Sequence, residues 1–246
     1  MDLTVEHVIP YGLGGRIELP ESSCRECGKL TSAFEHTCLR TMYGPLRLLY
    51  DLPSRRKKKR PKTLLLKIKR TAIEDWTYVE VEQEKYPFLI LFPYFSMPKT
   101  ITENIESDCR GAATDKFWIR GASPSFVFQE LLEQLVSELN VHSIMPEAKA
   151  QVGEFCQMLA KIGHSFAVGE LGVDAFRPFL IPHIVRSELS DCDRFIGGMS
   201  EDEAASKELH ELSIVNEAAN NLVIVRIRLL AILGTPTYYV IVGIKQ

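Results

Sequence analysis

A chain of 246 residues with 46% hydrophobic and 25% charged residues has the composition of an ordinary globular protein, which argues against a mostly disordered chain. Its longest apolar stretch, residues 222–233, is interrupted by Arg226 and Arg228 and is too short to span a bilayer, so we expect no membrane association. The first residues lack a basic start and an apolar core. We therefore expect no signal peptide and a cytoplasmic protein.

The net charge of −3 is unevenly distributed along the chain. Residues 1–70 contain 15 Lys and Arg against 7 Asp and Glu, whereas the remaining residues contain 14 against 25. Such asymmetry is typical of a protein whose basic part faces a polyanion. The N-terminal part is therefore the predicted nucleic-acid-binding surface.

The first elements are predicted to be strand, strand and helix. Apolar runs at residues 3–9 and 16–19 flank the turn-rich sequence PYGLGG, which indicates a hairpin with a long connection. Ser23 and Glu26 stand in a capping-box relation and predict a helix start. Four apolar residues then recur at every fourth position and predict one buried helix face: Leu30, Phe34, Cys38 and Met42. Gly44 and Pro45 predict the end of the helix.

Beyond a basic, exposed segment at residues 53–62, the chain is predicted to mix strands and helices. Three strands are expected in one antiparallel sheet, at 63–69, 76–84 and 88–95. Helices are expected at 125–139, 147–171 and about 173–186, and strands at about 221–231 and 237–244. The predicted fold class is α+β.

The residues that can carry chemistry lie near the N-terminus. Glu6 and His7 are followed by Pro10, Gly14 and Gly15, and then by a CxxC sequence at residues 24–27. The segments EHVIPYGLGG and SCRECGKLTSAFE resemble the nuclease core of bacterial HNH (ββα-metal) endonucleases, in which an acidic residue and a His precede a Pro…Gly-Gly turn and a CxxC. Two later segments, at 158–180 and 222–243, resemble the C-terminal region of uncharacterised bacterial members of that group.

This resemblance implies a division of the chain and an activity. It implies a ββα nuclease module at 1–50, a basic linker at 51–62 and a mixed α+β domain of unassigned role at 63–246. The implied activity is metal-dependent hydrolysis of DNA phosphodiester bonds. His7 would be the general base, since an imidazole titrates near neutrality. Glu6 would bind one divalent cation, Mg²⁺ or Mn²⁺, that stabilises charge on the phosphate.

One departure from the family pattern concerns the second metal ligand. HNH proteins commonly carry Asn or His after the CxxC, and Gly28 stands there in this chain. Glu35 is the best substitute, because Cys27, Thr31 and Glu35 follow at four-residue intervals on one helix face. His36 is the weaker candidate.

The second departure concerns zinc. Cys24 and Cys27 supply two thiolates, which are half of a tetrahedral structural site. Many relatives carry another CxxC before the catalytic His, whereas none of the six residues before His7 is Cys. Either the zinc has been lost, or the chain begins downstream of the true start. We expect this chain to bind structural Zn²⁺ weakly or not at all.

A run of six cations follows the predicted module. We expect it to contact phosphates, in preference to the alternative that it is only a solvated loop. Its members are Arg55, Arg56, Lys57, Lys58, Lys59 and Arg60. An alternative from another class is a catalytically weakened nucleic-acid-binding protein that keeps the HNH fold. Gly28 and the missing cysteines favour this alternative, and the intact Glu6-His7 pair favours the enzyme.

Overall fold

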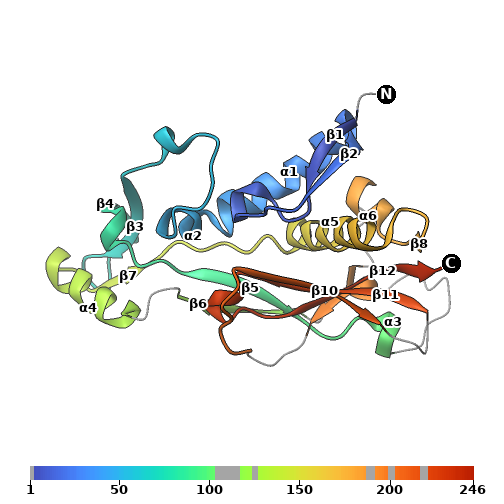
Figure 1. Ribbon diagram of the computed structural model, residues 1–246. Helices are drawn as coiled ribbons and strands as arrows, with labels where there is room; N and C mark the ends of the chain where they lie inside the picture. Colours follow the sequence, from blue (N-terminus) through green and yellow to red (C-terminus); the bar gives the residue numbers. More distant parts are fainter. Residues whose placement is uncertain (1–2, 103–116, 124–126, 187–191, 199–202, 217–220) are drawn as a thin grey trace.

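The computed structural model describes residues 3–102, 117–123, 127–186, 192–198, 203–216 and 221–246. These residues form a mixed α and β protein whose sheets are antiparallel, which confirms the predicted class at this level (Figure 1). Within the same ranges, no helix has the length and apolar character needed to cross a membrane.

The N-terminal segment has the expected order of two antiparallel strands and a helix. Strand β1 (Leu3–His7) pairs with β2 (Glu18–Cys24), and helix α1 (Arg25–Thr41) follows directly. The connection contains one turn of 3₁₀-helix, η1 (Tyr11–Leu13). This hairpin and helix are the elements that carry the candidate site.

Two glycines make the tight connection between β1 and β2 possible. Gly14 has a φ of 88°, in the left-handed region that glycine adopts without penalty. A Cβ atom on Gly15 would lie 1.9 Å from the carbonyl oxygen of Ile9, so only glycine fits there. The Gly-Gly pair thus turns the chain sharply after His7.

Two details of the predicted helix are wrong. The N-cap is Cys24, whose Sγ accepts a hydrogen bond from the backbone N–H of Cys27, so Ser23 and Glu26 form no capping box. Leu30 is 47% exposed, whereas Phe34, Cys38 and Met42 are buried. The first turn projects beyond the core that covers the later turns.

The middle of the chain forms a small sheet with the strand order β4-β3-β7. Its strands are β3 (Thr63–Lys69), β4 (Thr77–Glu82) and β7 (Ser143–Met145). Helix α4 (Phe128–Leu139) precedes β7 in the chain, and helix α2 (Gly44–Leu49) precedes β3. Two 3₁₀ turns also belong to this part of the chain: η2 (Lys57–Lys59) before β3 and η3 (Gln83–Lys85) after β4. The prediction that β5 (Ile90–Phe95) joins this sheet is wrong. It pairs with β6 (Phe117–Ala122), and its buried Phe92 and Tyr94 pack in the main core instead.

The C-terminal sheet has the strand order β10-β11-β12-β8, with β9 also pairing with β12. Its strands are β8 (Phe176–Pro178), β9 (Ile196–Gly198), β10 (His210–Asn216), β11 (Leu222–Leu229) and β12 (Tyr238–Lys245). The short helices α3 (Lys99–Thr102), α6 (Ile181–Arg186) and α7 (Cys192–Phe195) and the turn η4 (Ala231–Leu233) complete the described elements. The helix expected at about 173–186 is therefore present only at its end, as α6, and β8 occupies part of the predicted range before it.

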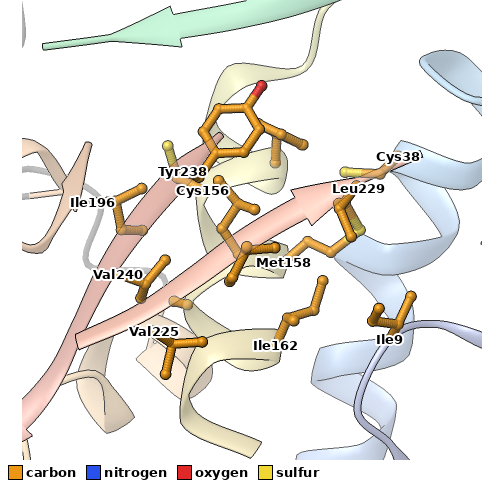
Figure 2. Close-up of a cluster of buried hydrophobic side chains, with 14 of the residues drawn as sticks. Ile9, Cys38, Cys156, Met158, Ile162, Ile196, Val225, Leu229, Tyr238 and Val240 are labelled. Carbon is orange, nitrogen blue, oxygen red and sulfur yellow. The ribbon is translucent and has the colours of Figure 1, made fainter. Parts of the chain in front are cut away.

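Helix α5 (Val152–Leu171) lies between the N-terminal hairpin and helix and the C-terminal sheet (Figure 1). Its buried residues share one hydrophobic core with residues of both neighbours. Figure 2 shows Ile9 and Cys38 beside the same cluster as Met158 and Val225. The site on the hairpin is therefore held in place by packing against residues more than a hundred positions later in the chain.

Candidate functional site: a buried ion cluster beside a basic cleft

Neighbouring residues of β1 place their side chains on different partners. His7 pairs with Glu18 across the hairpin, and its Nε2 lies 3.6 Å from Oε1 of Glu18. Glu6 precedes it on the strand and contacts Lys161 of α5 instead, because successive residues of a strand point to opposite faces. The Glu6-His7 dipeptide thus contributes an acid and an imidazole in two directions.

Lys161 gathers the two predicted acidic residues. Its Nζ lies 2.6 Å from Oε1 of Glu6 and 2.9 Å from Oε1 of Glu35. It also donates a hydrogen bond to the carbonyl oxygen of His7 and reaches that of Val8 at 3.4 Å. One ammonium group is therefore surrounded by four oxygen atoms from β1, the residue after it, and α1.

The cluster is shielded from solvent. The side chain of Lys161 is 2% exposed, and those of Glu6 and Glu35 are 16% and 15% exposed. Burial raises the pKa of Glu35, because the charged carboxylate loses hydration; Lys161 opposes this rise and Glu6 adds to it. Two carboxyl groups thus face one ammonium group in a partly dehydrated place.

His7 keeps one ring nitrogen without a protein partner. Its Nδ1 is buried and has no hydrogen-bond partner within the described ranges, and its ring lies 5.6 Å from that of Tyr11. A buried polar atom without a partner requires an explanation, since nearly all such atoms are satisfied in folded proteins. A water molecule or substrate atom in the neighbouring cleft would supply one.

A cleft of about 870 Å³ opens beside these residues. Glu6, His7 and Glu35 all line it. Cations from several segments line it as well: Arg25, Lys29, Arg47 and Arg55. The structure therefore places the predicted base and both predicted metal ligands in one basic cleft.

The six cations of the basic run are not equivalent. Arg55 lines the cleft, whereas Lys57 and Arg60 pair with Asp51. Arg60 also donates to the carbonyl oxygen of Leu52. Arg56, Lys58 and Lys59 are exposed. The run is thus folded back onto the chain at its end and reaches the cleft at its beginning.

The two thiols of the CxxC sequence sit at the start of α1. The hydrogen bond from the backbone N–H of Cys27 lowers the pKa of the Cys24 thiol. The side-chain hydrogen bond between the two thiols raises the pKa of the Cys27 thiol. Both thiols are free. No group of three or more His, Cys, Asp or Glu side chains suited to a metal occurs in the described part of the chain, and Glu6 with Glu35 supplies two such ligands.

Lys161 is the residue that the sequence reasoning missed. A signal for it exists: it stands between Ala160 and Ile162 in a long helix whose other neighbouring positions are mostly apolar. A charged residue is almost never fully buried unless it is paired. A lone Lys in a buried helix thus predicts an acidic partner elsewhere in the chain, although not which one.

Comparison with known proteins adds no identity to this geometry. The chain matches no family model, no curated protein and no solved structure. The site must therefore be interpreted from its own residues.

Proposed function

We propose that this protein is an endonuclease that hydrolyses phosphodiester bonds in DNA with the help of a divalent cation. The observation that carries the proposal is the joint position of His7, Glu6 and Glu35 in one cleft whose other walls supply Arg25 and Arg55. Cations bind the phosphate backbone without regard to sequence. An imidazole beside carboxylates supplies the base that a hydrolytic reaction requires.

The two carboxylates fit a divalent cation of the Mg²⁺ type. Such ions are usually bound through one or two carboxylates and complete their coordination with water and phosphate oxygens. Glu6 and Glu35 already converge on a single positive charge, that of Lys161. When bound, the cation would supply positive charge to the phosphate oxygens.

His7 performs the proton transfer in the proposed reaction. Nε2 of His7 lies 3.6 Å from a carboxylate oxygen of Glu18, and Nδ1 is the ring nitrogen to which the proposal assigns the role of base. In the proposed reaction Nδ1 takes a proton from the attacking water and the water oxygen bonds to phosphorus. The bond from phosphorus to the sugar oxygen breaks, and that oxygen leaves with the electron pair and takes a proton from solvent. Arg25, Lys29 and Arg55 hold the phosphates on either side.

The first test is a plasmid-nicking assay after removal of metal with EDTA and titration with Mg²⁺ or Mn²⁺. His7→Ala should lower the cleavage rate by about 10²- to 10⁴-fold, the usual contribution of a general base. His142→Ala is the matched control, because His142 is exposed and lies on the small sheet's border rather than in the cleft. Equal cleavage by wild type and His7→Ala would contradict the assignment.

A second candidate is a DNA-binding protein without cleavage activity. The ammonium of Lys161 between the two carboxylates favours it, because it already supplies the positive charge that a metal would bring. Gly28 stands where HNH nucleases commonly carry an Asn or His ligand, and this points the same way. Binding of DNA by wild type without cleavage in Mg²⁺, Mn²⁺, Ni²⁺ or Zn²⁺ would support this candidate and refute the nuclease.

A further inference from the structure

Lys161 contacts both carboxylates that the proposed function assigns to the metal. Its Nζ lies 2.6 Å from Glu6 and 2.9 Å from Glu35, and backbone carbonyls of His7 and Val8 complete its surroundings. All four of these polar partners are oxygen atoms. Hard divalent cations prefer this kind of environment, built from carboxylates and carbonyls.

The charges in the cluster do not balance. Glu6 and Glu35 carry two negative charges when ionised, and Lys161 carries one positive charge. Oε1 of Glu35 lies 2.9 Å from Nζ of Lys161, so both carboxylates share this one ammonium group. A divalent cation would neutralise both carboxylates, which one ammonium group cannot do.

The position of Lys161 also gives it a role in the fold. It reaches from the middle of α5 to β1 and α1, and its side chain is 2% exposed. Removing one partner of a buried ion pair leaves an uncompensated charge, which destabilises the folded state strongly. Without Lys161, two partly buried carboxylates from different elements would repel each other.

We propose that Lys161 is an internal counter-ion that holds Glu6 and Glu35 together and competes with a divalent cation for them. This inference rests on the proposed function only in taking these carboxylates as the metal ligands. Lys161 is thus a positioning residue: it keeps the two ligands adjacent before the metal binds, and its charge weakens the binding of the metal. Replacing Lys161 with a neutral side chain should therefore strengthen binding of a divalent cation.

The test measures thermal unfolding of the full chain by circular dichroism, with MnCl₂ as the probe, together with Mn²⁺ binding by calorimetry. Lys161→Met should unfold at a lower temperature than wild type without metal. At an Mn²⁺ concentration of 100 times its Kd, its Tm should rise by about 5 to 10 °C, as expected for a ligand that binds only the folded state. Its affinity for Mn²⁺ should exceed that of wild type by about tenfold or more.

Three further variants separate this role from a general effect on folding. Lys161→Gln can still donate to the carbonyl of His7 but carries no charge, so it should also gain Mn²⁺ affinity. Lys207→Met removes an exposed cation that does not line the cleft and should behave like wild type. The double variant Lys161→Met with Glu35→Gln should lose the added affinity, because one carboxylate ligand is gone.

Equal Mn²⁺ affinity in wild type and both Lys161 variants would overturn the inference. So would failure of both variants to fold with or without Mn²⁺, because the metal is expected to supply the missing charge. The result is independent of DNA cleavage. A protein that binds Mn²⁺ as described but never cuts DNA refutes the proposed nuclease and leaves the role of Lys161 standing.

Discussion

Two clusters of charged side chains lie in different parts of the fold, and they differ in their numbers of acidic and basic groups. At the N-terminal site, one ammonium faces two carboxylates beside a cleft. On the C-terminal sheet, Arg226 and Arg228 of β11 face Glu203 and Glu211. The second cluster has two cations and two anions, and none of its members lines the basic cleft.

The hydrogen bonds of the two clusters differ as well. Arg228 donates to the carbonyl oxygens of Glu203, Ala204 and Thr235, and Arg226 binds Glu203 and Glu211. The hydrogen-bond donors of Arg226 and Arg228 therefore join β11 to neighbouring segments. A balanced, fully bonded cluster serves the fold, whereas an unbalanced cluster beside a cleft has capacity for a further positive charge.

The largest expected effect on stability follows from replacing Arg228. Arg228→Met should lower the free energy of unfolding by about 3 to 5 kcal/mol, because three carbonyl oxygens lose their donor and each buried polar group left unsatisfied costs about 1 to 3 kcal/mol. Mn²⁺ should not restore it, because the carbonyl oxygens that lose their donor are dispersed over two loops. Urea unfolding with and without MnCl₂ measures both quantities. Recovery of Arg228→Met by Mn²⁺ would show that charge balance does not distinguish the two clusters.

Local sequence patterns predict the elements of the site better than their assembly. The hairpin and α1 follow from apolar runs, the Gly-Gly turn and helical periodicity, all within 40 residues. Glu35 was predicted as a partner of Glu6 from helix periodicity and the lack of a ligand at Gly28. Both residues contact Lys161, which lies more than 120 residues later in the chain. The local spacing of apolar and polar residues cannot predict a contact over such a separation.

Strand pairing was harder to predict than strand position. The segment 63–69 was predicted with the bounds that β3 has, and β11 and β12 lie within a residue or two of their predicted bounds. The partner of β5 was wrong, because an apolar run shows that a strand is buried but not which strand it pairs with. Strand β10 was missed, since its sequence HELSIVN alternates only briefly after an acidic stretch.

The second expected effect concerns His210, which links the two regions. Its Nε2 bonds the carbonyl oxygen of Leu13 in the turn near the site, and its Nδ1 accepts from the backbone N–H of Leu230 next to β11. Burial lowers the pKa of His210, because the charged imidazole would lose hydration. The unfolded chain therefore binds a proton more readily than the folded protein, and stability should fall as the pH drops below about 6.5.

His210→Gln removes the titrating imidazole and at least one of its two hydrogen bonds. At pH 7.5 it should lower the free energy of unfolding by about 1 to 2 kcal/mol. Between pH 7.5 and 5.5, the variant should lose less stability than wild type. Urea unfolding at both pH values checks this. His164→Gln should reduce the pH dependence in the same direction, since burial lowers the pKa of His164 too, and it controls for the bond to the turn, which His164 does not make. Equal pH dependence in wild type and His210→Gln would refute the assignment.

The smallest expected effect tests the imbalance itself. A carboxyl whose pKa is raised in the folded state binds protons more readily there than in the unfolded chain, so its contribution to stability is full at low pH and is lost as the pH rises through its folded pKa. Burial raises the pKa of Glu35 in this way. Glu35→Gln removes the cost of burying this carboxyl and leaves Lys161 paired with Glu6 alone. The free energy of unfolding should stay within about 0.5 kcal/mol of wild type or rise. Glu203→Gln, in the balanced cluster, should instead lower it by about 1 to 3 kcal/mol. Urea unfolding of both variants at pH 7 makes the comparison, and a larger loss in Glu35→Gln than in Glu203→Gln would mean that the N-terminal cluster, like the C-terminal one, is built for the fold alone.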